Sequence, residues 1–180
     1  MQIANELPLD LPLEQAWPLL TDLERVAPAM PGVRVEGVDG RDLRATMRVK
    51  VGPITVAYRA TVTLQSADEA TRTAVLRATG RELRGRGTVD ATVTAVLRPA
   101  GSSATAVALT TDLAVTGRVA QFGGGVIAEV ADRLLRQFAE RLVAQLDAPA
   151  DAAPAAGAAA AGAGASAAAA GGGTATATAP

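Results

Sequence analysis

Hydrophobic residues near the C-terminal end recur every three to four positions, which is the spacing of one helix face. Three glycines, Gly123, Gly124 and Gly125, lie near the start of this segment, although each glycine inside a helix costs about 1 kcal/mol relative to alanine. Two explanations stay open: the helix begins at Gly125 after a glycine loop, or bare backbone passes close to a strand or a ligand. The pattern predicts one long amphipathic helix within residues 116–146, with apolar positions Val119, Phe122, Val126, Ile127, Val130, Leu134, Phe138, Leu142 and Leu146.

The segment before residue 33 predicts a strand and two short helices. Residues 2–10 alternate between apolar and polar side chains, which is typical of a strand. Pro12 then opens a helix. A second short helix is expected around residues 23–29, before a Met-Pro-Gly turn.

From residue 33 onward the apolar positions alternate with a period of two. This alternation is typical of an antiparallel meander with one dry face, and only the C-terminal helix is long enough to cover that face. The predicted fold is therefore α+β: a curved, antiparallel, seven-stranded sheet wrapped around a long C-terminal helix, with two short helices after the first strand. The six later strands are expected in segments 33–38, 43–51, 54–64, 73–80, 89–99 and 105–117.

The composition divides the chain near residue 148. Residues 149–180 are almost only Ala, Gly, Pro and Thr, with Asp151 as the one charge, and they offer no large apolar side chain for burial. We expect residues 1–148 to form one ligand-binding domain and residues 149–180 to be a disordered linker or tail.

Charge and residue usage exclude several classes of function. The chain has 17 basic and 18 acidic residues and few aromatic ones, which disfavours nucleic-acid binding. It has no His and no Cys, so His-dependent triads, thiol nucleophiles, disulfides, most metal sites and Fe–S clusters are excluded. No signal peptide or membrane span is recognisable, and we expect a soluble, cytoplasmic protein.

Four motifs carry a resemblance to a known family. They are RVAPAMPGV (25–33), VKVGPITVAY (49–58), GRELRGRGTVDATV (80–93) and VTGRVAQFGGGVIAEVADRLLRQF (115–138). Together they resemble the CoxG family of carbon monoxide dehydrogenase subunits, which belongs to the START-like, or SRPBCC, helix-grip superfamily. The resemblance covers residues 1 to about 146 and supports the predicted fold.

This resemblance implies a non-catalytic accessory protein of an aerobic molybdenum carbon monoxide dehydrogenase or a related molybdenum hydroxylase. It implies a lipophilic quinone, of the menaquinone type, as the bound ligand, and no covalent cofactor. It also implies peripheral association with the inner face of the cell membrane. Family members often carry a low-complexity linker followed by a membrane-associating segment; in this sequence the linker is present without such a segment.

The inward positions of the predicted sheet are rich in small side chains. Periodicity alone favours a tightly packed core, whereas the resemblance favours an apolar cavity beneath the helix, which suits an apolar ligand. Met adapts its shape and aromatic rings stack on flat ligands, and a side chain at Gly124 is expected to enter the space below the helix. The predicted ligand-binding residues are Met30, Met47, Val49, Tyr58, Ala60, Leu76, Val93, Leu109, Leu113, Phe122, Gly124, Val126 and Val130.

Charged residues suggest surfaces rather than catalysis. Arg81, Arg84 and Arg86 lie in a glycine-rich loop between two strands, and we predict that they dock a partner. The outer sheet face carries Arg44, Arg48, Lys50 and Arg59, with Arg72 and Arg77 as further candidates, and is expected to be mainly a solvated face. Asp90 and Asp112 are at outward strand positions, where acid–base catalysis is disfavoured.

Three functions remain in competition. The favoured one is carriage of a hydrophobic molecule to the dehydrogenase. The second is a structural adaptor with a packed core that links the enzyme to the membrane. The third is an enzyme of the polyketide cyclase type on the same fold, which a cavity with a convergent carboxylate or Tyr would favour.

Overall fold

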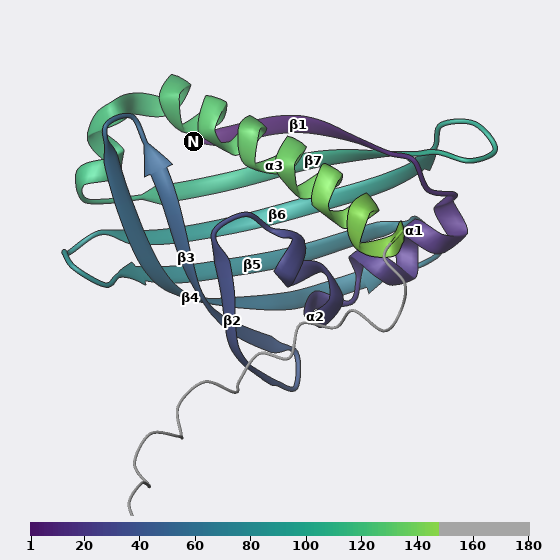
Figure 1. The fold of residues 1–180 in the computed structure, drawn as a ribbon, viewed down its shortest axis with the longest axis horizontal. Helices are drawn as coiled ribbons and strands as arrows, with labels where there is room; N and C mark the ends of the chain where they lie inside the picture. The colour runs from purple at the N-terminus through teal and green to yellow at the C-terminus, as the bar shows by residue number, and fades with distance from the viewer. Residues whose placement is uncertain (148–180) are drawn as a thin grey trace, which may run out of the picture. The chain divides into compact units, whose positions relative to one another are not determined.

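The structure, a computed structural model, describes residues 1–147 and contains one antiparallel sheet with a long helix lying across it (Figure 1). The predicted order of elements and the number of strands are confirmed. Residues 149–180, expected to be a tail, lie outside the described residues. The elements are β1 (Gln2–Leu9), α1 (Leu13–Leu20), α2 (Leu23–Val26), η1 (Ala27–Ala29), β2 (Val33–Asp39), β3 (Asp42–Val51), β4 (Ile54–Asp68), β5 (Thr73–Glu82), β6 (Thr88–Pro99), β7 (Thr105–Val115), η2 (Arg118–Phe122) and α3 (Gly123–Asp147), where η marks a 3₁₀-helix.

The strands β2 to β7 form a meander, and β1 is added to it at the β7 edge. The strand order is β1-β7-β6-β5-β4-β3-β2, and each neighbouring pair is antiparallel. The strand β4 continues to Asp68, beyond the end predicted at Leu64, because a bulge after Leu64 lets it resume pairing with β5. Bulges bend a strand and increase its twist, which favours a curved sheet.

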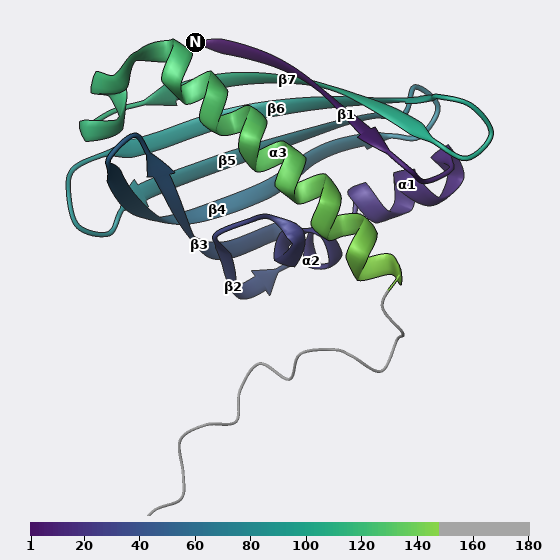
Figure 2. The same cartoon turned by 45° about the horizontal axis from the view of Figure 1, so that its top comes forward.

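The helix α3 lies across the concave face, and its C-terminal end is near α1 and α2 (Figures 1 and 2). It begins at Gly123, where φ is +77°, and not at 116 or Gly125 as the pattern predicts. The preceding 3₁₀-helix η2 is set off by a second left-handed glycine, Gly117, with φ +82°. A Cβ placed on Gly123 or Gly125 would meet no described atom within 4 Å. Close backbone approach therefore does not explain the glycines, whereas a change of direction at Gly123 does.

The hydrophobic core forms two clusters at opposite ends of α3. The first, the Trp17 cluster, joins α1 to β1, β6, β7 and the second half of α3, and contains Leu9, Trp17, Leu97, Phe138 and Leu142 among others. The second, the Tyr58 cluster, consists of Ile3, Val51, Val56, Tyr58, Val119, Ile127 and Val130. Each fully buried large aliphatic or aromatic side chain contributes about 1.5–3 kcal/mol, so α3 is fixed to the sheet at two separate places.

An arginine at the β4–β5 turn fixes α1 to the sheet. The backbone of Arg72 is left-handed, with φ 51°, and its carbonyl accepts a hydrogen bond from Leu97 N at 3.0 Å. Its guanidinium lies 5.6 Å from the Trp17 ring centroid and 3.0 Å from the Glu14 carboxylate. Arg72 therefore belongs to the α1 contact and not to the outer sheet face, for which the sequence makes it a candidate.

The turn into β2 generates a test of the fold. Gly32 has φ +78°, and a Cβ there would lie 2.1 Å from the Arg48 carbonyl oxygen. Gly40, in the β2–β3 turn, has φ +62° and open space around it. We expect Gly40→Ala to cost about 1–2 kcal/mol for the left-handed backbone, and Gly32→Ala to cost a further 1–3 kcal/mol or so for the clash. Urea unfolding measures both, and equal losses would contradict the predicted close contact between Gly32 and β3.

Candidate functional site

The middle of the concave face is apolar and only half buried. Ala60 and Val62 of β4, Leu76 and Ala78 of β5, and Val93 of β6 share the inward parity of buried neighbours on their strands, yet they keep intermediate exposure. None of the five belongs to either core cluster. We call these five residues the central apolar area. Its partial exposure indicates that α3 does not fill the space between the two clusters.

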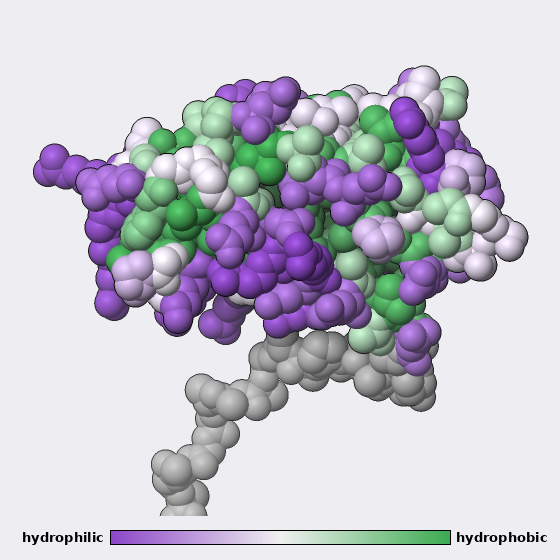
Figure 3. Space-filling model, turned by 90° about the horizontal axis from the view of Figure 1, so that it is seen from above, coloured by the Kyte–Doolittle hydropathy of each residue, from purple (hydrophilic) through white to green (hydrophobic). Residues whose placement is uncertain are grey.

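Hydrophobic residues also reach the surface on the face seen from above. Figure 3 shows them in patches between polar side chains. A soluble protein exposes scattered apolar atoms anyway, so the informative feature is the inward direction of the five residues rather than their number. This direction places them where an apolar molecule would contact both the sheet and the helix.

The predicted ligand-binding residues fall into three groups. Ala60, Leu76 and Val93 lie in the central apolar area. Met47 is half buried on the inner face of β3 and belongs to neither cluster. Most of the others lie in or against the clusters: Tyr58, Val130, Val49, Leu113, Phe122 and Val126 at the Tyr58 cluster, and Met30 and Leu109 at the Trp17 cluster.

Gly124, the predicted ligand-binding residue in the first turn of α3, lies close to the start of the chain. The residue is exposed, and a Cβ there would meet the side chain of Met1, with Met1 Cε at 3.1 Å. Met1 is itself 48% exposed at the start of the chain. A side chain at Gly124 would therefore contact Met1 at the start of β1, and the expectation that it reaches a ligand below the helix stays a prediction.

A buried carboxylate that the sequence analysis missed lies at one end of the concave face. The strand β5 runs to Glu82, which the sequence pattern assigns to the loop, and the Glu82 side chain is only 3% exposed. It faces inward and is the cross-strand neighbour of Tyr58. The sequence did contain one sign of this inward direction: Glu82 continues the two-residue alternation of the inward positions Ala74, Leu76 and Ala78.

Glu82 is paired with an arginine from η2. Arg118 Nη2 donates to Glu82 Oε1 at 2.5 Å, and the Gly87 N–H donates to Oε2 at 3.3 Å. The hydrogen bond from Arg118 holds the pKa of the Glu82 carboxyl below its usual value, against the opposing effect of burial. Glu82 is therefore ionised at neutral pH and acts as an acceptor only.

Three glycines surround this carboxylate. A Cβ on Gly85 would lie 2.4 Å from Glu82 Oε2, and one on Gly87 would lie 2.8 Å from the same atom. A Cβ on Gly117 would lie 2.7 Å from the Gly87 Cα. A side chain at any of the three positions would force Glu82 or the Gly87 backbone to shift, and the glycine-rich motifs at 80–93 and 115–138 converge on the Glu82–Arg118 ion pair.

Tyr58 lies beside this ion pair with an unused hydroxyl. The residue is 6% exposed, and its Oη is buried and has no hydrogen-bond partner in the described structure. Burial raises the pKa of the Tyr58 hydroxyl, the charge of Glu82 raises it further, and Arg118 opposes the shift. The hydroxyl is therefore protonated at neutral pH and available as a donor.

The predicted docking arginines are exposed. Arg81, Arg84 and Arg86 lie at the end of β5 and in the following loop, beside Leu83, which is 45% exposed. Within residues 1–147 none of the three arginines takes part in an ion pair. This loop therefore presents unpaired positive charge around one apolar side chain.

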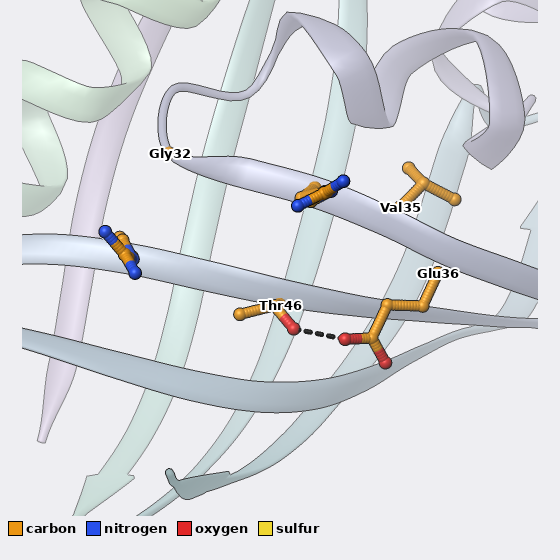
Figure 4. A pocket seen from close by; sticks show the side chains of 6 residues that line it. Gly32, Val35, Glu36 and Thr46 are labelled. Atoms are coloured by element: carbon orange, nitrogen blue, oxygen red, sulfur yellow. Dashed lines mark hydrogen bonds between the residues drawn. The ribbon is translucent and has the colours of Figure 1, made fainter. Parts of the chain in front are cut away.

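The outer sheet face is polar and partly paired. Arg77 contacts Asp90 at 2.8 Å, which lowers the pKa of the Asp90 carboxyl, and Asp112 accepts a hydrogen bond from Gln2. An open groove of 690 Å³ lies over β2 and β3 (Figure 4). Its lining is too polar for an apolar ligand, and it lies on the side of the sheet opposite the central apolar area. The lining residues are Gly32, Arg34, Val35, Glu36, Thr46 and Arg48.

The described residues offer little else for chemistry. Residues 1–147 contain no group of three or more His, Cys, Asp or Glu side chains that would hold a metal ion. No helix within this part of the chain is long and apolar enough to cross a membrane.

Solved structures share this fold at low sequence identity. A conserved protein from Geobacillus kaustophilus matches with a TM-score of 0.70 and 20% identity, over 82% of this chain and 94% of that one. The Zhui aromatase/cyclase from Streptomyces sp. R1128 matches with a TM-score of 0.56 and 12% identity, over 82% and 93% of the two chains. A START superfamily protein from Mycobacterium smegmatis matches with a TM-score of 0.53 and 12% identity, over 81% and 97%. These likenesses confirm the helix-grip fold and do not by themselves indicate an activity.

The comparison with protein families is more specific. No curated protein sequence matches the chain. The model of the carbon monoxide dehydrogenase CoxG subunit family matches residues 7–147, which is nearly all of the part that the structure describes. All four motifs singled out in the sequence lie within this match. The chain therefore belongs to the CoxG family of carbon monoxide dehydrogenase subunits.

Proposed function

We propose that this protein carries an apolar ligand for a molybdenum-containing carbon monoxide dehydrogenase or a related molybdenum hydroxylase. Family membership supports the accessory role. The observation that carries the proposal is the central apolar area, which faces α3 and yet stays half buried between two complete core clusters. A lipophilic quinone of the menaquinone type has the chemistry to cover such a surface and to accept electrons from the dehydrogenase.

The mechanism is shielding and transfer. Exposing the apolar surface of a quinone with a long hydrocarbon chain to water costs about 25 cal/mol for each Å². Such a quinone therefore leaves a bilayer only if that surface stays out of water. The inner faces of β4, β5 and β6 and the middle of α3 supply a matching apolar surface. The protein itself then needs no catalytic group, because the electrons pass between the dehydrogenase and the quinone.

The β5–β6 loop is the contact for the dehydrogenase in this proposal. Arg81, Arg84 and Arg86 are exposed there, and exposed charges increase the association rate with a partner of opposite charge. The same protein would also meet the inner surface of the cell membrane, where each cation near anionic lipid contributes about 1 kcal/mol. Peripheral membrane association is therefore part of the proposal.

Two alternatives are less well supported. A packed adaptor without a ligand has no need for half-buried inward residues such as Val62 and Val93. A cyclase-type enzyme would use Glu82 or Tyr58 as an acid or base, but the ion pair with Arg118 lowers the pKa of Glu82, and burial raises that of Tyr58. Both shifts stabilise the ordinary protonation states and disfavour proton transfer near neutral pH.

Filling the central apolar area separates carriage from the packed adaptor. We expect Val93→Phe and Ala60→Leu to melt near the wild-type temperature, because accessible volume would receive the added atoms. They should lose most uptake of a menaquinone analogue in an extraction assay while still binding the dehydrogenase. Thr92→Phe, the neighbouring position on the outer face, is the matched control and should retain uptake. Overpacking of a full core costs about 1–3 kcal/mol, so strong destabilisation of both variants, with no quinone recovered from the wild type, contradicts carriage.

Charge removal tests the docking loop. We expect replacement of Arg81, Arg84 and Arg86 by Ser to weaken dehydrogenase binding about tenfold or more at low salt, since each exposed pair contributes about 0.2–1 kcal/mol. The triple Ser variant at Arg44, Arg48 and Lys50 on the outer face removes the same charge and should bind normally. Surface plasmon resonance over a range of salt concentrations measures both. Equal weakening by the two variants would indicate a general charge effect and no loop contact.

A further inference from the structure

We propose that the Tyr58 hydroxyl donates a hydrogen bond to an uncharged oxygen of the carried ligand, and that movement of η2 uncovers it. This inference rests on the proposed carriage function and adds the polar contact that fixes the orientation of the ligand. It also narrows the ligand class to neutral, largely apolar molecules with a carbonyl-type oxygen at one end.

The hydroxyl has no role inside the folded protein. Tyr58 is the one tyrosine of the chain, is 6% exposed, and has an Oη without any partner in residues 1–147. Burying a hydroxyl without a hydrogen bond is unfavourable, and phenylalanine would fill the same space without that cost. A buried hydroxyl without a hydrogen bond inside the protein therefore indicates a hydrogen-bond acceptor that comes from outside the chain.

The position of Tyr58 suits such a partner. Tyr58 and Ala60 lie two residues apart on the inner face of β4, so the phenol adjoins the central apolar area. On the neighbouring strands its register partners are Met47 and Glu82. A ligand lying on Ala60, Leu76 and Val93 would therefore have one end at the Tyr58 cluster.

The surrounding charges select the ligand group. Glu82 is already engaged by Arg118 and by the Gly87 N–H, and its negative charge acts on Tyr58 more strongly than the opposing positive charge of Arg118. An anionic ligand group such as a carboxylate would be repelled by Glu82, whereas a neutral carbonyl oxygen accepts from the phenol without that penalty. The site is therefore expected to prefer a ketone, ester or quinone to a fatty acid.

Access requires a movement, because the Tyr58 Oη is closed off in this conformation. The element η2 is bounded by two left-handed glycines, Gly117 and Gly123. It contributes Val119 to the Tyr58 cluster and is held to β5 by the Arg118–Glu82 ion pair. Arg118 is 56% exposed, so this ion pair can open toward solvent while Glu82 keeps its bond from Gly87. We infer that η2 is the lid over the hydroxyl.

The Tyr58→Phe variant tests the hydrogen bond with two probes that share the same carbon skeleton. The probes are 2-methyl-1,4-naphthoquinone and 2-methylnaphthalene, which differ by the two carbonyl groups. We expect the variant to bind the quinone about tenfold more weakly, as for the loss of one good hydrogen bond, and the hydrocarbon within twofold of wild type. Its melting temperature should stay equal or rise, because no bond inside the protein is lost.

A spectroscopic readout and a matched control complete the test. The carbonyl stretching band of the bound quinone should lie at lower wavenumber in the wild type than in Tyr58→Phe. Thr94→Val removes a half-buried hydroxyl on the outer face of β6, and should change neither affinity nor the band. If the wild type binds both probes and Tyr58→Phe alters neither, the hydroxyl contact is overturned and carriage stands. If the wild type binds neither probe, carriage itself is overturned.

Stopped-flow binding tests the lid. Arg118→Lys keeps the positive charge but replaces the guanidinium with a single ammonium group, and should loosen η2. We expect a severalfold faster association of the quinone probe with Arg118→Lys, and no change with Arg98→Lys, an exposed arginine at the far end of β6. Unchanged association rates in a variant that melts like the wild type would overturn the role of η2 as a lid.

Discussion

The structure depends on one geometric constraint: a single helix must cover the inner face of a sheet that is much wider than the helix. Seven strands spaced about 4.8 Å apart span about 29 Å, whereas a helix with its side chains is about 10 Å wide. The sheet reduces the difference by curving, and α1 covers part of the face beside the second half of α3. At the other end η2 and the first half of α3 cover the Tyr58 cluster. The area left over is the middle of β4, β5 and β6, where inward side chains stay half buried.

At the end near η2 the inner face of the sheet is closed by a buried carboxylate, and burying a charge is energetically unfavourable. Desolvation of an ion pair often cancels its Coulomb energy, and removal of one partner leaves an uncompensated buried charge. The Glu82–Arg118 pair reduces this cost because Arg118 stays more than half exposed while Glu82 gains a bond from the Gly87 N–H. The ion pair is therefore better understood as a fixed but reversible attachment of η2 than as a large source of stability.

The sequence predicted the order of strands and helices, but it missed where β4 ends and where α3 begins. Alternation placed every strand, because inward and outward positions differ strongly on a one-sided sheet. It ended β4 at Leu64 because a bulge shifts the alternation by one residue and hides the continuation to Asp68. It started the helix wrongly because the apolar spacing of η2 continues that of α3, and only Gly123, with φ +77°, separates them.

The candidate site was predictable where it depends on residue size and not where it depends on pairing. Small inward residues such as Ala60 were compatible with a packed core or with spare volume, and only the family resemblance favoured a cavity; in the structure Ala60 is half buried. Glu82 was placed in a loop because glycines and arginines surround it in the sequence, and charged residues are rarely buried unless they are paired. Its partner Arg118 is 36 residues further along the chain, and a single sequence gives no sign that the two meet.

The arrangement of α3 has a consequence for how a ligand would enter. The helix is fixed by Ile127 and Val130 at one end and by Phe138 and Leu142 at the other. Between them, Leu134 and Leu135 are half buried, Leu134 against the Tyr58 cluster and Leu135 against the Trp17 cluster. Releasing either end would expose several large apolar side chains, at about 1.5–3 kcal/mol each. Moving η2 exposes Val119, the half-buried ring of Phe122 and one ion pair whose arginine already reaches solvent. The lower cost lies at η2, so ligand exchange there leaves the helix in place and the fold intact.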